Sequence, residues 1–440
     1  MTNFLTLNNV ADIMGVPLAV VRHWADAGVR SVRHDEAGRI GFYMKDCADI
    51  PPIKAMIETN WEEEMNVVPR RDFTSIELFA GAGGLALGLH KAGFRNVLLN
   101  EIDATACATL RANQPGWNVL EADIHKVDFT SLKGKIDLLS GGFPCQAFSY
   151  AGKKGGLEDS RGTLFFELAR AVSEISPKVF FCENVKGLLS HDNGRTLLTI
   201  KRAVGELGYT LIEPRVLKAV MYQVPQKRER LMLVGIRNDL SGLCNFKWPS
   251  PYHRVMTLRD AFYKGELYAD DVPPSIGQEY PAKKRRVMAM VPEGGDWRDL
   301  PVSVQKEYMG GSFYLGGGKT GMARRLSMDE PSLTLTCSPA QKQTERCHPT
   351  QTRPLTVREY ARVQTFPDEW RFTGSMSEQY KQIGNAVPVN LAYAMGRALM
   401  RLVNEIDSQQ TEESRLTEAL DESKKICARH NIGYTGTLFL

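Results

Sequence analysis

Apolar residues in this chain recur in two alternating patterns from about residue 74 onward. Short apolar runs bounded by glycine or polar residues predict buried strands, and apolar residues three or four positions apart predict helices. The predicted strands span 75–79, 97–100, 119–120, 136–140 and 179–182, and the predicted helices span 84–92, 104–113 and 162–175. Strands that alternate with helices are typical of a doubly wound, mostly parallel sheet. We therefore expect an α/β fold over 74–240.

The pattern changes at several points, which divide the chain into six segments. Residues 241–353 are irregular, rich in glycine and proline, and contain basic runs at 283–286 and 324–325. Helical periodicity returns over 354–407, and a polar tail follows over 408–440. Residues 1–60 form a small unit of their own. Residues 61–73, which contain the acidic run 62–64, are expected to be a linker between this unit and the main domain. We expect a main domain with a smaller lobe inserted into it.

The N-terminal unit has the spacing of a helix-turn-helix. Two short amphipathic segments flank the turn Gly15-Val16-Pro17, with Val20, Val21 and Trp24 expected inside and Arg22 and His23 outside, and 28–43 could form a small wing. The segment resembles the N-terminal DNA-binding unit of the mercury-resistance-regulator and excisionase families, with four arginines at its expected outer surface, namely Arg22, Arg30, Arg33 and Arg39. Residues 1–50 hold five basic and six acidic residues, so a simple helical cap on the next domain is the alternative.

Charge and cysteine content narrow the class of protein. The net charge of +4, from 55 basic and 51 acidic residues, permits a nucleic acid partner but requires that any basic surface be local. The eight cysteines form no C-x-x-C pair, so neither a zinc site nor a disulfide framework is indicated and no metal is expected. No stretch approaches the ~18 apolar residues of a membrane span. We expect a soluble protein of the reducing cytoplasm.

A glycine-rich turn after the first predicted strand indicates a nucleotide cofactor. Residues 79–86 match G-x-G-x-x-A, and Glu101 follows Gly81 by twenty positions, at the end of the second strand. The glycines allow the backbone to approach a ligand, and the carboxylate can accept both ribose hydroxyls. NAD and S-adenosylmethionine share that ribose, so the motif does not choose between them. Asp123 could hold the adenine edge, although an aspartate after a strand is more often a helix cap.

Cys145 lies on a tight loop directly after the predicted strand 136–140. Gly141 and Gly142 end that strand, and Pro144 fixes the backbone just before the thiol. A buried structural cysteine is the alternative. Downstream, Glu183 follows another apolar strand, and Gln226, Arg228 and Arg230 follow in the stretch Val-Pro-Gln-Lys-Arg-Glu-Arg. A thiol, a carboxyl and two guanidinium groups near strand ends are what addition to an electron-poor ring requires.

The chain resembles the DNA (cytosine-5)-methyltransferases from about 74 to 402, with the family's motifs in order. They stand at 79–84, 100–103, 121–124, 142–149 (Gly-Phe-Pro-Cys-Gln-Ala-Phe-Ser), 159–165, 183–185 (Glu-Asn-Val), 226–230 (Gln-Lys-Arg-Glu-Arg), 353–359 and 382–387 (Gln-Ile-Gly-Asn-Ala-Val). The resemblance implies methyl transfer from S-adenosylmethionine to C5 of a cytosine flipped out of double-stranded DNA, in a restriction-modification system with a possible cognate endonuclease. The helix-turn-helix unit lies outside the minimal family pattern.

The resemblance also implies roles for individual residues. Cys145 would be the nucleophile, Glu183 would contact the target ring, and Arg228 and Arg230 would support the site. Segment 241–353, here called the recognition lobe, corresponds to the family's target-recognition region. The residues implied to bind the cofactor are Phe79, Gly81, Gly83, Glu101, Ile102, Asp123, Ile124, Pro144, Leu164, Asn385 and Val387. Those expected to contact DNA are Gln226, Arg324, Arg325, Thr334 and Leu335.

Four other hypotheses about the function of this chain can be tested. A cytosine-5 methyltransferase acting on RNA would use the same Cys and Glu, although the Pro-Cys-Gln loop and the long basic lobe favour DNA. A nicotinamide dehydrogenase would share the glycine turn but does not explain Cys145 with Glu183. An adenine or cytosine-N4 methyltransferase needs an Asp, Asn or Ser followed by Pro-Pro and an aromatic residue, which the sequence lacks. A transcriptional regulator acting through residues 4–50 is the alternative from a different class.

Overall fold

A central sheet of eight strands organises the chain in a computed structural model. The structure describes residues 4–36, 38–143, 164–316 and 319–429, with side chains as far as 411. Seven strands follow the order β10-β12-β8-β7-β4-β5-β6, and β9 pairs with β12. Their bounds are β4 Phe73–Leu78, β5 Phe94–Glu101, β6 Val119–Glu121, β7 Leu138–Gly141, β8 Val179–Val185, β9 Tyr209–Leu211, β10 Arg215–Lys218 and β12 Glu229–Arg237. Strands β4 to β8 pair in parallel and β9, β10 and β12 antiparallel, so the predicted doubly wound, mostly parallel sheet is confirmed.

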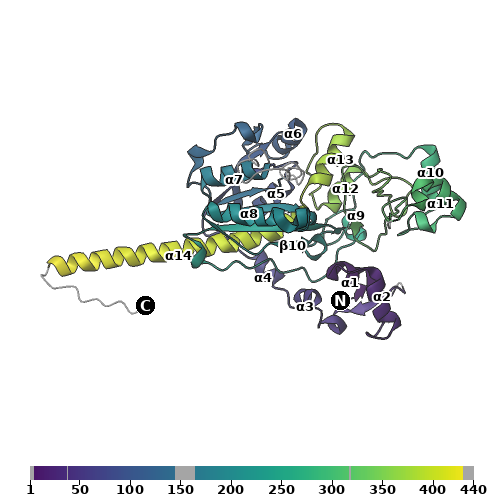
Figure 1. Cartoon of the computed structure of the whole chain (residues 1–440), viewed down its shortest axis with the longest axis horizontal. Helices are drawn as coiled ribbons and strands as arrows, with labels where there is room; N and C mark the ends of the chain where they lie inside the picture. The colour runs from purple at the N-terminus through teal and green to yellow at the C-terminus, as the bar shows by residue number, and fades with distance from the viewer. Residues whose placement is uncertain (1–3, 37, 144–163, 317–318, 430–440) are drawn as a thin grey trace.

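Alternating apolar residues bury both faces of this sheet. In β8, Val179 and Phe181 point into one core, while Phe180 and Cys182 point into the other. Successive side chains of a strand face opposite sides, so a strand covered on both sides must be apolar throughout. The first core lies under α5 (Gly84–Lys91) and α14 (Val389–Arg429), and the second under α7 (Leu164–Ile175) and α8 (Arg195–Glu206). α6 (Ala104–Asn113) connects β5 to β6 (Figure 1).

The N-terminal unit has a small core of its own. It contains β1 (Phe4–Thr6), α1 (Leu7–Met14), α2 (Leu18–Asp26), β2 (Arg33–His34), β3 (Ile40–Tyr43) and α3 (Pro51–Ile57), with the strands in the order β1-β3-β2. Thr6 caps α1, and Gly15 ends it at φ +75°, a conformation that favours glycine. Val21 is buried and Arg22 and His23 are exposed, as expected. Trp24, also expected inside, is partly buried against this core. Val20 was expected inside but is 40% exposed, because adjacent residues of a helix point in different directions and Val21 faces the core.

The segment 61–73 was expected as a linker, but it packs into the main domain. Trp61 begins α4 (Trp61–Met65) and is buried in the core beneath α14. The Arg397 guanidinium of α14 lies 4.2 Å from the centre of the Trp61 ring, a cation–π contact. The acidic run that suggested a linker instead forms the outer face of this helix, apart from the buried Glu64.

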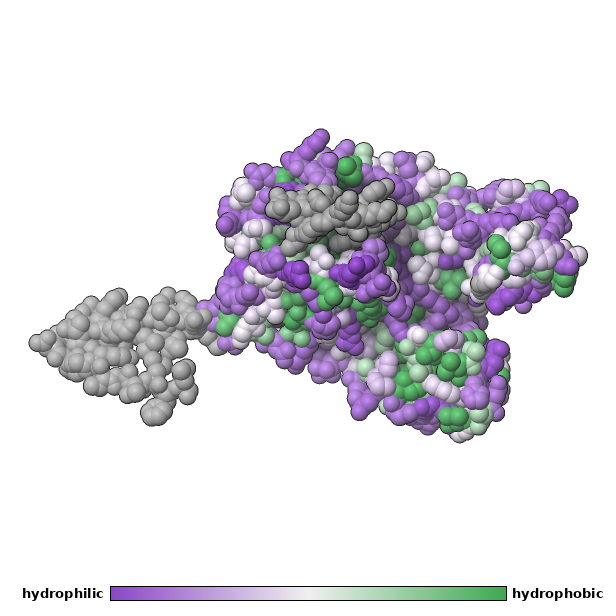
Figure 2. Space-filling model, viewed as in Figure 1, coloured by the Kyte–Doolittle hydropathy of each residue, from purple (hydrophilic) through white to green (hydrophobic). Residues whose placement is uncertain are grey.

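The recognition lobe is largely irregular, as its composition predicted. Its regular elements are short: α9 Leu258–Phe262, α10 Ala282–Ala289, α11 Val302–Met309 and β13 Ser332–Leu333. A small apolar core that includes Tyr280, Met288 and Leu300 holds its outer part. Its inner part shares a larger core with α12 (Val357–Val363) and α13 (Met376–Asn385). The lobe projects beside the sheet, and the space-filling view shows a notch between it and the N-terminal unit (Figure 2).

The last helix, α14, closes the fold against α5. A Cβ on Gly88 would lie 2.3 Å from Cβ of Ala392, and one on Gly396 would lie 2.7 Å from Cβ of Ala92, so only glycine permits this approach. We expected a polar tail after 408, yet α14 continues to Arg429 and extends away from the body (Figure 1). Across the described residues, no helix is both long and apolar enough to cross a membrane.

Candidate active site

The turn between β4 and α5 presents its backbone at the carboxyl end of the sheet. Phe79, Gly81 and Gly83 all have positive φ, at +58°, +52° and +86°. A Cβ on Gly81 would meet no atom within 4 Å, so this glycine faces open space. A Cβ on Gly83 would lie 2.6 Å from Cδ2 of Leu110, so this glycine is required for packing against α6. The turn therefore offers a ligand one open backbone edge on a tightly packed support.

Glu101, at the end of β5, faces this turn. Its carboxylate accepts hydrogen bonds from the backbone amides of Gly81 (2.7 Å), Ile102 (2.8 Å) and Asp103 (2.9 Å). Because parallel strands end at one edge, a residue twenty positions from Gly81 is brought into direct contact with it. The next side chain, Ile102, is 67% exposed. A fixed carboxylate beside an exposed aliphatic side chain can hold a ribose and cover one face of a base.

The other expected cofactor residues line the same edge of the sheet or its support. Asp123 caps a short turn and accepts a hydrogen bond from the ring of His125, and this bond lowers the pKa of Asp123. Ile124 is buried in the core under α7, and Leu164 is the first residue of that helix. Asn385 ends α13 and its side-chain oxygen accepts from Cys337 Sγ at 3.2 Å. Val387 is buried, and its carbonyl oxygen is 2.3 Å from where a Cβ on Gly84 would stand.

Glu183 and Arg230 meet at the ends of β8 and β12. The Arg230 Nε lies 2.5 Å from Oε1 of Glu183, and both side chains are 12% exposed. The other carboxylate oxygen faces β7, where a Cβ on Gly142 would lie 3.1 Å from it. Asn184 Nδ2 donates to the carbonyl of Phe143 at 2.9 Å and holds the chain there. Pro144 and Cys145 follow directly in sequence but lie outside the described residues.

Arg228 is buried behind this pair. Its Nη1 donates to the carbonyl oxygens of Gly384 (3.1 Å) and Leu335 (3.4 Å). It therefore joins the segment 226–237, here called the catalytic strand, to α13 and to the recognition lobe. Burial lowers its pKa to about 9, which leaves the guanidinium charged at neutral pH. Arg228 therefore holds neighbouring segments together, and its expected role in supporting catalysis stays a prediction.

Comparison with known proteins assigns the family of this chain. Residues 73–401 match the family model of the C-5 cytosine-specific DNA methylases. The chain belongs to this family. Its methylase domain thus includes every site element described above and excludes the N-terminal unit.

Relatives and a solved structure agree with this assignment. The chain is 60% identical over 405 residues to the type II methyltransferase M.Eco47II of Escherichia coli, covering 92% of this chain and 97% of the relative. It is also 60% identical over 396 residues to the type II methyltransferase M.PspPI of a Psychrobacter strain, covering 90% and 95%. A crystal structure of a prophage-encoded DNA modification methyltransferase from Escherichia coli is similar at 25% identity with a TM-score of 0.54, covering 76% of this chain and all of that one. The chain is therefore a cytosine-5 DNA methyltransferase of the restriction-modification type.

The recognition residues of this methylase lie differently from expectation. Gln226 was expected to contact DNA, but it is fully buried, accepts from the amide of Leu335 at 3.0 Å and donates to Gln364 at 2.8 Å. Leu335 is likewise buried, and the Thr334 hydroxyl donates to the carbonyl of Lys227 at 2.6 Å. These side chains attach the recognition lobe to the catalytic strand. The strand pair between them has only two residues on each side, so side-chain hydrogen bonds are needed to hold it together.

Arg325, also expected to contact DNA, is 5% exposed and has its guanidinium turned inward. It donates to five carbonyl oxygens and one hydroxyl, those of Met288, Val291, His348, Pro349, Gln351 and Thr352. No donor is left to face a phosphate, so the expectation for this residue is wrong. The neighbouring Arg324 is partly exposed and lies 3.3 Å from Asp296.

Sequence reasoning missed Gln364, which connects these parts of the methylase. Its side-chain amide donates to the carbonyl oxygens of Ile383 (2.7 Å) and Ala386 (3.1 Å), and its oxygen accepts from Gln226. The residue is fully buried directly after α12. The segment 360–366 mixes apolar residues with Arg362, Gln364 and Thr365, so nothing in the sequence distinguishes Gln364 from its polar neighbours.

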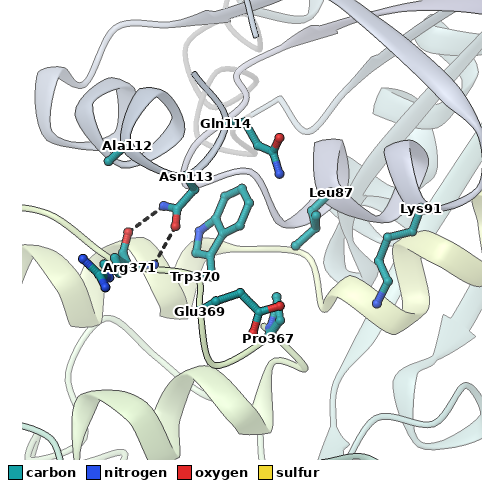
Figure 3. A pocket seen from close by; sticks show the side chains of 9 residues that line it. All are labelled: Leu87, Lys91, Ala112, Asn113, Gln114, Pro367, Glu369, Trp370 and Arg371. Atoms are coloured by element: carbon teal, nitrogen blue, oxygen red, sulfur yellow. Dashed lines mark hydrogen bonds between the residues drawn. The ribbon is translucent and has the colours of Figure 1, made fainter. Parts of the chain in front are cut away.

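A pocket of about 470 Å³ lies beside α5 (Figure 3). This helix follows the turn between β4 and α5, here called the cofactor turn. Trp370 lines the pocket and also packs on Gly83, since a Cβ there would lie 3.1 Å from the indole Cζ2. Asn113 holds this wall by exchanging hydrogen bonds with the backbone of Arg371, both 2.7 Å long. The pocket contains none of the expected site residues. Within the part of the chain that is described, no cluster of three metal-ligating side chains occurs.

Proposed function

We propose that this enzyme transfers a methyl group from S-adenosylmethionine to C5 of a cytosine within a specific duplex sequence, as the modification partner of a separate restriction endonuclease. The main support is the Glu183–Arg230 pair beside the strand end that leads into Pro144 and Cys145. The cofactor turn and Glu101 lie at neighbouring strand ends. The relatives described above are named as type II methyltransferases, which supports the restriction-modification role.

The residues at the cofactor turn fit S-adenosylmethionine. The open edge at Gly81 can receive the ligand's polar end, the Glu101 carboxylate can accept from ribose hydroxyls, and exposed Ile102 can cover the adenine. When bound, the cofactor supplies an electrophilic methyl group on a positively charged sulfur. Pro144 is proposed from the sequence motif alone. The remaining candidate contacts are Phe79, Gly83, Asp123, Ile124, Leu164, Asn385 and Val387.

Cytosine C5 is a weak nucleophile, so the enzyme must activate the ring. In the proposed reaction the Cys145 thiolate forms a bond to C6, which places electron density on C5 for attack on the methyl group. Loss of the C5 proton then re-forms the double bond and expels the thiolate. Glu183 is proposed to hold the N3 and amino edge of the ring, and Arg230 to fix the orientation of Glu183 and to favour the thiolate nearby.

The reacting carbon is inaccessible inside a stacked duplex. The cytosine must therefore leave the helix, at a cost of a few kcal/mol that contacts to the remaining duplex must offset. We propose that the recognition lobe supplies those contacts through its exposed loops rather than through Gln226, Leu335 or Arg325, which are buried. Arg324 and Thr334 remain candidates, because both are partly exposed.

Bisulfite sequencing of DNA from cells that express the protein tests this proposal. Protected cytosines should cluster in one short sequence context, which also identifies the target. A Cys145→Ser variant serves as the matched control and should leave every cytosine convertible. If no protected cytosines were found in DNA but new ones were found in transfer RNA, the RNA alternative would be favoured.

A further inference from the structure

The N-terminal unit is attached to the methylase domain by apolar and polar contacts. Met221 and Val255 of the body pack against the core of the unit. Lys218 Nζ donates to the carbonyl oxygens of Asp12 (3.2 Å) and Ile13 (2.6 Å), near the C-terminus of α1. A cation at this end of a helix satisfies free carbonyls and opposes the helix dipole. The unit is therefore positioned with a defined orientation on the body.

A second set of contacts involves the catalytic strand itself. Lys227 Nζ lies 2.7 Å from Oδ2 of Asp12 and 3.3 Å from Oε2 of Glu330. The other oxygen of Glu330 accepts from Thr6 Oγ1 at 3.3 Å and from Asn8 Nδ2 at 3.1 Å. The three charged side chains are only about one-fifth exposed, at 24% for Asp12, 22% for Lys227 and 19% for Glu330. Ion pairs this shielded are screened less by salt than surface pairs are.

Lys227 links these contacts to the candidate active site and to the recognition lobe. Lys227 stands between Gln226 and Arg228, in β11 (Gln226–Lys227), which pairs in parallel with β13. Glu330 lies two residues before β13, and Thr334 follows that strand. Each strand of this pair has two residues, which is too short to hold its register without other contacts. The N-terminal unit, the catalytic strand and the recognition lobe thus meet at one lysine.

We propose that the N-terminal unit is a clamp that holds the recognition lobe in register with the catalytic strand, with Asp12, Lys227 and Glu330 as positioning residues for target recognition. The wing of the unit adds a contact of the same kind, since Arg39 lies 3.5 Å from Asp329, which also binds Arg259 at 3.0 Å. Small displacements of a lobe that reads base edges change discrimination more than chemistry, because the cofactor site lies on other strand ends.

The arginines of the unit support this reading over direct DNA binding. Arg30 forms a two-pronged pair with Asp49, at 2.8 and 2.6 Å, and Arg39 pairs with Asp35 at 2.6 Å. Two of the four arginines expected to face a duplex are thus neutralised by acids of the same unit. Phosphate binding scales with the number of free cations, so this surface is a weak duplex site.

The test compares Asp12→Asn, Glu330→Gln and the double variant in the full-length enzyme. Both changes remove charge without changing shape, and Glu330→Gln retains an acceptor for Thr6 and Asn8. Asp49→Asn is the matched control, because it removes an ion pair of the same unit that does not touch the body. The measurements are kcat, KM for duplex and for S-adenosylmethionine, Tm, and the ratio of methylation at the target to that at sites with one changed base pair.

Each clamp variant should raise KM for the duplex about three- to tenfold and lower the discrimination ratio by a similar factor, with KM for the cofactor unchanged. The double variant should be little worse than the more affected single variant, because both act through Lys227. Unchanged discrimination in folded clamp variants, or an equal effect of Asp49→Asn, would overturn the proposal. A rise in KM on Arg22→Ala without one on Glu330→Gln would instead assign direct DNA binding to α2. The inference rests on the proposed function. If the unaltered enzyme were inactive, the result would contradict the proposed function and not the clamp.

Discussion

The catalytic edge of the sheet and the recognition lobe use their polar side chains in opposite ways. At the sheet edge, strand pairing satisfies the backbone within the strands, and the polar side chains at the strand ends are acceptors: Glu101 accepts from three amides of the adjoining turns, and Glu183 pairs with Arg230. Both carboxylates are thereby fixed where a ligand would bind. In the lobe, few backbone groups have partners in regular structure, and buried arginines supply the missing donors. Arg325 binds five carbonyl oxygens, and Arg346 donates to the carbonyls of Thr334 and Glu345. A basic residue in an irregular segment is thus as much a structural element as a ligand for DNA.

At the catalytic edge of the sheet, the largest effect on activity is expected from a change of Cys145. Cys145→Ser should reduce methyl transfer by at least about 10³-fold, because no other thiol in the motif can add to the ring. Cofactor binding measured by calorimetry should be unchanged, because the candidate cofactor residues other than Pro144 lie on other elements of the fold. Duplex with 5-fluorocytosine at the target should trap a covalent complex with unaltered enzyme, visible on a denaturing gel, and active enzyme without that adduct would contradict the mechanism.

For the recognition lobe, Arg325→Ala should lower the free energy of unfolding by at least about 3 kcal/mol, because several buried carbonyl oxygens lose their donor at once. Denaturant unfolding measures this effect. Arg324→Ala is the neighbouring control and should cost no more than about 1 kcal/mol, as its partner Asp296 keeps its pair with Arg298. Normal stability with weakened DNA binding in Arg325→Ala would restore the original expectation for this residue.

His348 should make the lobe sensitive to acid. Burial lowers the pKa of His348 from 6.5 to about 4, and its Nδ1 accepts from the amides of Thr350 and Gln351, which requires an unprotonated nitrogen. The unfolded chain binds a proton at higher pH than the folded one, so stability should fall as pH drops from 6.5 to 4, by about 3 kcal/mol in total.

Denaturant unfolding across this pH range measures the slope. His348→Gln should flatten it, and the exposed His34 provides the control, for which His34→Gln should leave the slope unchanged. An identical pH profile for unaltered enzyme and His348→Gln would show that the ring is not held neutral in the folded lobe.

At the sheet edge the smallest effect is expected from Glu101→Ala. Loss of two hydrogen bonds from ribose hydroxyls to a carboxylate should weaken S-adenosylmethionine binding by about 1.5–3 kcal/mol. Calorimetry measures this change, and Glu101→Gln should give an intermediate loss. Unaltered affinity in both variants would remove Glu101 from the cofactor site.

The sequence predicted the sheet and its edge well because regular structure converts spacing into position. Gly81 and Glu101 meet because parallel strands end together, and the apolar runs located those strands to within a few residues. The direction of Arg325 was not predictable, because it depends on carbonyls from 288 to 351 that only tertiary folding gathers. Trp61 was misjudged for a related reason, since the acidic residues beside it concealed a buried anchor.

The contact between α5 and α14 also determines when the main domain can finish folding during its synthesis. Gly88 of α5 packs on a helix that begins about 300 residues later, at Val389. At 5–20 residues per second, the ribosome needs about 15–60 s to reach that helix after completing α5. Until then the core on one face of the sheet, with Phe73, Leu138 and Phe181, lacks the part of its cover that α14 provides. A nascent chain is therefore an inactive enzyme with an exposed apolar surface until nearly its whole length has been translated.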